Sequence, residues 1–178
     1  MISTTYIPSI PMPTSKSTSR VILGIDPGYA DTGYGVIERT RSSVRYITCG
    51  TISTKKNMPF GDRLVSLADA FDTLIRKYSP AVIAVEKIFF AQNQKTAIDV
   101  AQARGIIIMY TARQALPLME FTPLQVKQRL TAYGHADKRQ VARMVMTLLR
   151  LRTLKEKNDA IDALAVALCA SFERSIIG

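Results

Sequence analysis

Hydrophobic residues along the first half of this chain occur in short blocks and then at helical spacing. Apolar runs at residues 21–26, 33–38 and 44–53 are bounded by turn-forming or polar residues, and their lengths are typical of β-strands. From Leu64 to Ile75 the apolar positions recur every three or four residues, which predicts a helix with Asp62 as its N-cap. The first half therefore predicts three strands followed by a helix.

The next segment predicts an alternation of strand and helix. Apolar runs at residues 81–86 and 118–121 read as two further strands, and a mostly apolar helix from about residue 94 to residue 114 separates them. With the first three strands, this order predicts an α/β protein with a five-stranded mixed sheet flanked by helices.

Three helices are expected in the last third of the chain. Thr122 followed by Pro123 is typical of an N-cap with proline at the first helical position, and Asp137 is a second N-cap candidate. The final helix is expected to run from Asn158 to about Arg174. These helices would complete the cover of the sheet.

The first nineteen residues differ in composition from the rest. They are rich in Ser, Thr and Pro and contain no acidic residue, which predicts a disordered extension ahead of one folded domain at residues 20–178. A targeting presequence is the alternative, because such peptides are also rich in Ser and poor in acids. A plain tail is preferred because no amphipathic helical face is evident in this segment.

Composition indicates a globular protein with an acidic partner. Hydrophobic residues make up 47% of the 178 residues, and 24 basic against 14 acidic side chains give a net charge of +10. Nucleic acid is the usual partner of such a chain. No apolar run is long enough to cross a membrane. Cys49 and Cys169 lack metal-ligand spacing, so we expect buried thiols and a cytoplasmic protein.

Four acidic residues occur where apolar segments end or begin. Asp26 and Glu86 each close an apolar strand, and Asp159 and Asp162 lie three residues apart at the start of the last helix. Ligands of α/β sheets bind at strand ends, and carboxylates there would repel one another unless cations bridge them. We therefore expect a Mg²⁺ site, with two ions and Mn²⁺ as a substitute. Taken singly, Asp159 could be a helix cap and Asp162 a surface residue.

The motifs around these acids resemble those of the bacterial RuvC family of Holliday-junction endonucleases, which has the RNase H-like fold. They are GIDPG followed by TGYGVI, then AVEKIFFAQNQKTAIDVAQARG, then NDAIDALAVAL, and the similarity runs from about Arg20 to Cys169. The resemblance implies a metal-dependent endonuclease in DNA recombination and repair. It would make symmetric paired nicks in four-way junctions and leave 5′-phosphate and 3′-hydroxyl ends.

The same resemblance implies roles for individual residues and partners. Asp26, Glu86, Asp159 and Asp162 would be the catalytic metal ligands. An aromatic at Phe89 would stack on unpaired bases, and Lys127 and Lys138 would contact phosphates near the cleaved bond. Asn93 and Arg104 extend this polar surface, and we expect them to reach phosphates too. The family works as a homodimer with the RuvA and RuvB branch-migration proteins.

Three features depart from the family pattern. The N-terminal extension lies outside the family core, and the chain ends at Gly178 without the basic tail of some members, which leaves tail contacts with DNA in doubt. His135, the single histidine, stands where many members have a small or basic residue. We expect it to be a solvent-facing loop residue rather than a DNA contact or a proton-transfer group.

Three other functions fit parts of the sequence. A related nuclease could act on RNA or on other branched DNA, and a catalytically silent module could bind junctions without cutting them. The complete set of four carboxylates argues against the silent module. The GIDPG turn also occurs in ATP-dependent sugar kinases, but 178 residues are too few for the usual second lobe.

Overall fold

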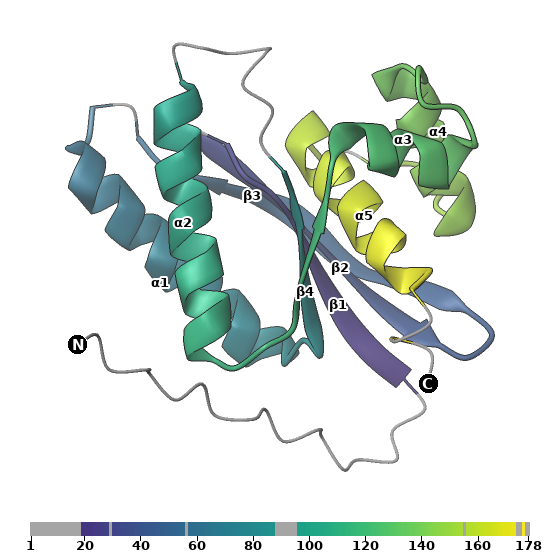
Figure 1. Ribbon diagram of the computed structural model, residues 1–178, viewed down its shortest axis with the longest axis horizontal. Coiled ribbons are helices and arrows are strands. Elements are labelled where there is room, and N and C mark those ends of the chain that lie inside the picture. The colour runs from purple at the N-terminus through teal and green to yellow at the C-terminus, as the bar shows by residue number, and fades with distance from the viewer. Residues whose placement is uncertain are drawn as a thin grey trace, which may run out of the picture.

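The computed structural model describes residues 19–28, 30–55, 57–87, 96–154, 156–173 and 176. Five strands form one mixed sheet in the order β3-β2-β1-β4-β5, as the sequence predicts (Figure 1). The first three strands are antiparallel, and β4 and β5 run parallel to β1. The strands are β1 (Ser19–Asp26), β2 (Asp31–Thr40), β3 (Val44–Ser53), β4 (Val82–Glu86) and β5 (Leu118–Phe121).

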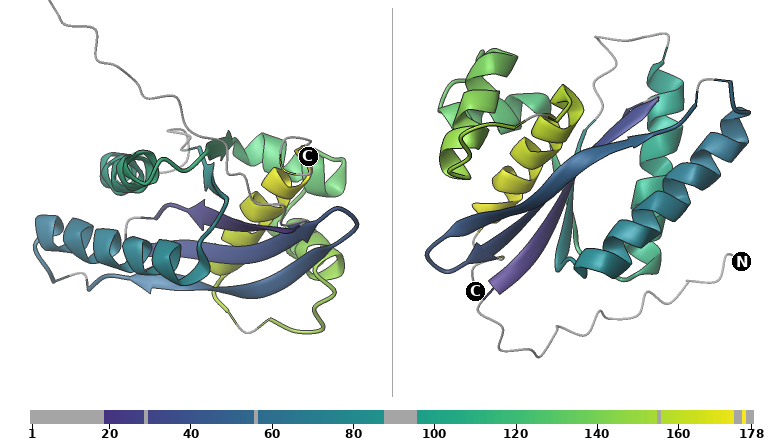
Figure 2. Two further views of the ribbon diagram at one scale, coloured as in Figure 1. Left: turned by 90° about the horizontal axis from the view of Figure 1, so that it is seen from below. Right: turned by 180° about the vertical axis from the view of Figure 1, so that it is seen from behind.

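Within the described residues, five helices cover the two faces of the sheet, with α1 and α2 on one face and α3, α4 and α5 on the other (Figure 2). None of the helices in the described part of the chain is long and apolar enough to cross a membrane. The helices are α1 (Phe60–Tyr78), α2 (Ala97–Arg113), α3 (Pro123–Thr131), α4 (Lys138–Leu148) and α5 (Asn158–Ser171).

The sheet separates two hydrophobic cores because successive residues of a strand point to opposite faces. Leu23 of β1 packs in the core under α1 and α2, together with Phe71 and Ile107. The neighbouring residue Ile22 packs on the other side against α5, which is buried from Ala163 to Ser171. The near-continuous apolar runs of β1 and β4 follow from this burial on both faces.

Several predicted boundaries need correction. Ser19 belongs to β1 rather than to the extension, while residues 1–18 lie outside the described part of the chain. Asp62 does not cap α1, which begins at Phe60 after Pro59; the Arg63 amide donates to the Pro59 carbonyl. Pro59 has no side-chain acceptor, so α1 begins without a side-chain cap.

The other helix ends agree better with the sequence. Thr122 and Asp137 each form a capping box. The side chain of the N-cap residue accepts a hydrogen bond from the N3 amide, and the side chain of the N3 glutamine accepts one from the amide of the N-cap residue. Helix α2 begins at Ala97 and α5 ends at Ser171, each about three residues inside the predicted range. Helix ends are seldom visible in a sequence to better than this.

Helix α5 lies directly on the first two strands because glycine faces it there. A Cβ atom on Gly24 of β1 would lie 2.2 Å from the Ala163 carbonyl oxygen, and one on Gly33 of β2 would lie 2.0 Å from the Asp159 carbonyl oxygen. Ordinary side chains at these positions would push the helix away from the sheet. This contact fixes the N-terminal turn of α5 close to the end of β1.

The two cysteines are free and buried, as expected. Cys169 lies within α5, and burial raises the pKa of its thiol to about 12. Burial also raises the pKa of the Cys49 thiol. Both side chains therefore stay protonated near neutral pH and serve as small apolar core residues.

Candidate active site

Asp26 and Glu86 lie at one edge of the sheet because β1 and β4 are adjacent and parallel (Figure 1). Each is the last residue of its strand. Asp159 and Asp162 occupy the first turns of α5, which the glycine contacts hold against β1 and β2. The structure thus brings together the four carboxylates that the sequence singles out.

The pKa of Asp26 responds to the charges of the other three carboxylates. Burial raises the pKa of its carboxyl well above the usual 3.8, and the charges of Glu86, Asp162 and Asp159 raise it further. A side-chain hydrogen bond joins Asp26 to Glu86, and burial raises the pKa of Glu86 as well. Two carboxyl groups can share a hydrogen bond only when one of them carries a proton, so the Asp26–Glu86 pair holds one proton.

Two lysines compensate part of the negative charge. The Lys138 ammonium lies 3.1 Å from Oδ2 of Asp162, and this contact raises the pKa of Lys138. The charges of Lys138 and Lys127 offset part of the rise that burial causes in the pKa of Glu86. Lys138 begins α4 and Lys127 lies in α3, so three helices converge on the carboxylates. The two lysines predicted to contact phosphate therefore lie beside the acidic cluster.

A fifth carboxylate, Asp31, was not among the predicted site residues. It is the first residue of β2, and its charge contributes to the raised pKa of Asp159 after the effect of burial. Its Oδ1 accepts a hydrogen bond from Ser53 and lies 3.2 Å from the Lys157 ammonium, just before α5. Only a short connection between the paired strands β1 and β2 separates Asp31 from Asp26. This closeness in the sequence was the one signal that could have placed Asp31 near the site. Asp31 ties β2 and β3 to the start of α5.

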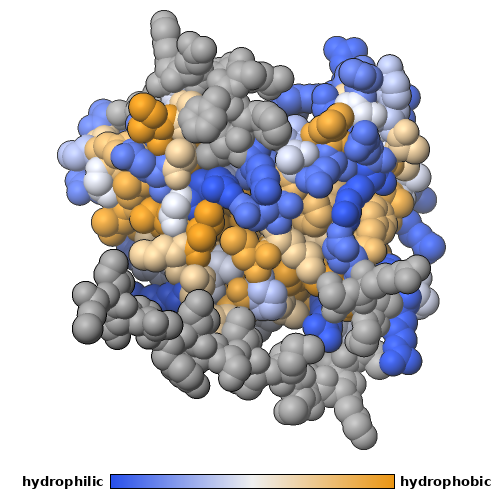
Figure 3. Space-filling model, in the orientation of Figure 1, coloured by the Kyte–Doolittle hydropathy of each residue, from blue (hydrophilic) through white to orange (hydrophobic). Residues whose placement is uncertain are grey.

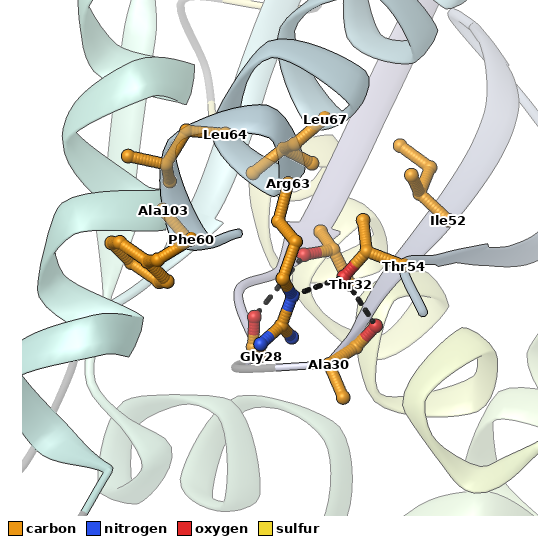
Figure 4. A pocket seen from close by; sticks show the side chains of 10 residues that line it. All are labelled: Gly28, Ala30, Thr32, Ile52, Thr54, Phe60, Arg63, Leu64, Leu67 and Ala103. Carbon is orange, nitrogen blue, oxygen red and sulfur yellow. Dashed lines mark hydrogen bonds between the residues drawn. The ribbon is translucent and has the colours of Figure 1, made fainter. Parts of the chain in front are cut away.

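Arg63 of α1 was also missed, and it supports the turn after Asp26. Its side chain is only 3% exposed and points toward the backbone of Gly28 and Ala30 (Figure 4). The Arg63 Nε donates to Thr54 Oγ1 at 2.9 Å, and the Thr54 amide donates to the Ala30 carbonyl at 2.9 Å. Arg63 was missed because a charged residue in the amphipathic pattern of α1 is expected to face solvent.

The structure describes two of the four remaining residues that the sequence analysis singled out, Arg104 and His135. Phe89 and Asn93 lie outside the described residues. Arg104 of α2 forms an ion pair with Glu120 of β5, so its guanidinium has a partner within the chain. His135 is exposed in the loop between α3 and α4, where its ring lies 5.7 Å from that of Tyr133. The solvent-facing position expected for His135 is confirmed.

The donor set fits a hard divalent cation. All four groups are carboxylates, and oxygen ligands of this kind are those that Mg²⁺ and Mn²⁺ take in proteins. No three acidic, histidine or cysteine side chains among the described residues are disposed as a preformed ligand set. A proton between Asp26 and Glu86 and the Lys138 ammonium on Asp162 hold the carboxylates in pairs instead. A cation would take over the charge compensation that these groups now supply.

Comparison with protein families gives a match over most of the chain. The model of the family described as "Crossover junction endodeoxyribonuclease RuvC" matches residues 22–170. The protein of that name from Thermosipho melanesiensis is 48% identical over 152 residues, which is 85% of this chain and 97% of the relative. Its namesake from Synechococcus sp. is 49% identical over 153 residues, or 86% of this chain and 99% of the relative.

Solved structures show the same likeness in three dimensions. The structure of Thermus thermophilus RuvC superposes with a TM-score of 0.80 at 30% identity, covering 87% of this chain and 96% of that one. The structure of T. thermophilus RuvC in complex with a Holliday junction substrate superposes with a TM-score of 0.80 at 30% identity. This match covers 86% of this chain and 93% of that one. The yeast mitochondrial Holliday junction resolvase Ydc2 shares the fold, with a TM-score of 0.62 at 18% identity and coverage of 86% and 78%.

Proposed function

Because this chain belongs to the RuvC family of crossover junction endodeoxyribonucleases, with their RNase H-like fold, we propose that it resolves four-way DNA junctions. The observation that carries the proposal is the meeting of Asp26, Glu86 and the two α5 carboxylates beside Lys127 and Lys138. Acidic groups in a protein of net charge +10 are suited to cutting a polyanion with the help of cations. The products would carry 5′-phosphate and 3′-hydroxyl ends.

The four carboxylates would hold the metal of this metal-dependent family. We propose Mg²⁺, with two ions per site and Mn²⁺ as a substitute. Ions bound there supply an activated water and stabilise the leaving oxygen of a phosphodiester. Asp26 and Glu86 come from the rigid centre of the sheet, and Asp159 and Asp162 come from a helix pinned by glycine contacts. Ligands on such elements keep their positions when the substrate binds.

Lys138 and Lys127 would contact phosphates next to the cleaved bond. The Lys138 side chain is 76% exposed although it reaches Asp162, so its ammonium is accessible to DNA. Phe89 would stack on an unpaired base, an interaction worth about 1–3 kcal/mol. Asn93, four residues after Phe89, would contact the phosphate backbone of the DNA. For Arg104, phosphate contact would require exchange of its present partner Glu120.

We predict that Lys138→Gln weakens junction binding and lowers its salt dependence. Loss of one phosphate contact should reduce the slope of log K against log salt by about one. Fluorescence anisotropy with a labelled junction in Ca²⁺, over a series of KCl concentrations, measures this slope. Lys77→Gln is the control because Lys77 is exposed on α1, on the far face of the sheet. An unchanged slope for Lys138→Gln would remove this lysine from the DNA surface.

We also propose a homodimer, in which two sites cut opposed strands of a nearly two-fold junction. Support comes from α2, where Ile98 is 69% exposed and Met109 is 47% exposed. Figure 3 shows hydrophobic residues at the surface over this helix. A symmetric interface would cover them. By family likeness, RuvA and RuvB are proposed partners, and the cytoplasm is the proposed compartment.

Cleavage of synthetic DNA tests the proposed function. The wild-type chain in Mg²⁺ should nick a four-way junction at paired, symmetric positions and leave ends that ligase can seal. It should cut a linear duplex of the same sequence or an RNA–DNA hybrid far less. Glu86→Gln should bind the junction and cut it poorly in Mg²⁺, and Ca²⁺ should not support cutting by either protein.

The rival functions make different predictions in the same assay. A nuclease for RNA or other branched DNA would prefer one of the non-junction substrates. A silent junction-binding module would bind without nicking in Mg²⁺, and Glu86→Gln would change nothing. Either result would overturn the proposal.

A further inference from the structure

A groove lies at the end of the molecule opposite the acidic cluster. It has a volume of about 610 Å³ and opens between the β2–β3 hairpin, the end of α4 and the end of α5. These elements meet at the lower right of Figure 1, whereas β1 and β4 end near its top. Helix α5 spans the interval, and its 14 residues correspond to about 20 Å. The groove is therefore separate from the proposed catalytic site.

More than half of the residues that line the groove are apolar. Leu148 and Leu151 of the α4 end and Val44 and Tyr46 of β3 are partly exposed there, and Phe172 after α5 is 41% exposed. Apolar concavities of 300–1,000 Å³ are typical of binding sites. A phosphate backbone gains little from such a floor, because its contacts are polar and charged.

Positive charge surrounds this apolar floor. Arg39, Arg45 and Arg150 line the groove, and the described residues that line it include no acid. Arg45 pairs with Glu38, but the Nε of Arg39 is buried and has no hydrogen-bond partner within the described structure. Arg39 also lies directly across from Arg20 of β1, and like charges in that position repel. An anionic group in the groove would offset the positive charge of Arg39 and relieve this repulsion.

We propose that this groove docks a peptide segment of a partner protein that combines apolar side chains with carboxylates. The leucines, Tyr46 and Phe172 would receive the apolar side chains, and the planar guanidinium groups of Arg39 and Arg150 would pair with carboxylates. A partner held there would leave the opposite edge of the sheet open to DNA. The proposal requires no chemistry at the carboxylate cluster.

Selection from a random peptide library displayed on phage tests the proposal. The full chain is the target, and the double variant Arg150→Glu, Phe172→Ser is used for counter-selection, since both side chains are exposed. The matched control is Arg76→Glu, Val65→Ser on α1, which changes the same charge and removes an exposed apolar side chain. Circular dichroism and thermal melting verify that all three proteins are folded.

The proposal predicts enrichment of peptides with two or more carboxylates next to aliphatic or aromatic residues. Synthetic copies should bind the wild type and the α1 control equally, and the groove variant at least tenfold more weakly. Junction binding and cleavage by the groove variant should match those of the α1 control. Absence of enrichment, or peptides indifferent to the groove variant, would refute the proposal. Loss of junction affinity would assign the groove to DNA, and altered sedimentation would assign it to a second copy of this chain.

Discussion

Asp26→Asn is expected to lower junction cleavage more than about 100-fold and at the same time to make the metal-free protein more stable. Loss of an outer-shell partner of a metal ligand alone typically costs 10–100-fold, so removal of a proposed ligand should cost more. The stabilising effect arises because Asp26 lies buried among three other carboxylates. A neutral amide at this position needs no bound proton to lie beside the other carboxylates, and it still donates a hydrogen bond to Glu86.

The pH dependence of this effect follows from the raised pKa of Asp26. A carboxyl group whose pKa is higher in the folded state than in the unfolded state destabilises the fold once the pH exceeds the unfolded value. The penalty is absent below about 3.8 and complete above the raised pKa. We therefore expect the Asp26→Asn substitution to stabilise the metal-free protein near neutral pH and to lose this advantage in acid.

Thermal melting in EDTA and junction cleavage in Mg²⁺ measure the two effects. We expect a gain of about 1 kcal/mol for Asp26→Asn, or about 2–4 °C in Tm for a domain of this size. Asp62→Asn is the matched control, because Asp62 is exposed on α1. Destabilisation by Asp26→Asn, or cleavage at the wild-type rate, would contradict the role given to Asp26.

Gly33→Ala should disable the enzyme without touching any charged group. The new Cβ would lie 2.0 Å from the Asp159 carbonyl oxygen, so the first turn of α5 must move away from the sheet. Overpacking of this kind costs about 1–3 kcal/mol, and a displacement near 1 Å at a reacting centre costs about 100-fold in rate. We expect both losses, because Asp159 and Asp162 would move with the helix.

Gly61→Ala is the matched control for this substitution. Gly61 lies in the first turn of α1, and a Cβ there would meet nothing within 4 Å. Alanine at this helical position should raise the stability by about 0.5–1 kcal/mol and leave cleavage unchanged. Chemical denaturation and single-turnover cleavage compare the two variants. Equal behaviour of Gly33→Ala and Gly61→Ala would show that the approach of α5 does not position the site.

The strands and the main acidic residues were predictable because their signals are local. An apolar run followed by Pro27 and Gly28 is enough to place Asp26 at a strand end, and the five strands lie where the sequence predicts them. The burial on both faces of β1 and β4 also follows from their composition. The convergence of Asp26 with the α5 acids was expected only from the assumption that the last helix crosses the sheet there.

The supporting residues could not be predicted because their contacts are distant in sequence. Asp31 contacts Lys157, which is more than one hundred residues away in the sequence, and Arg63 of α1 lines a small pocket together with Gly28 and Ala30 of the turn after β1. Arg104 was expected to contact DNA because of its place in the polar segment, and its ion pair with Glu120 of β5 had no signal in the sequence. Nothing local in the sequence encodes such pairings.

Diffraction from crystals of the full chain soaked in Mn²⁺ tests most directly whether the carboxylates form one cation site. Anomalous scattering locates the ions independently of any assumption about the ligands. We expect Mn²⁺ in contact with both Asp26 and Glu86 and with at least one acid of α5, and no such signal in Asp26→Asn. Mn²⁺ bound elsewhere in crystals of a protein that still cuts junctions would contradict the account.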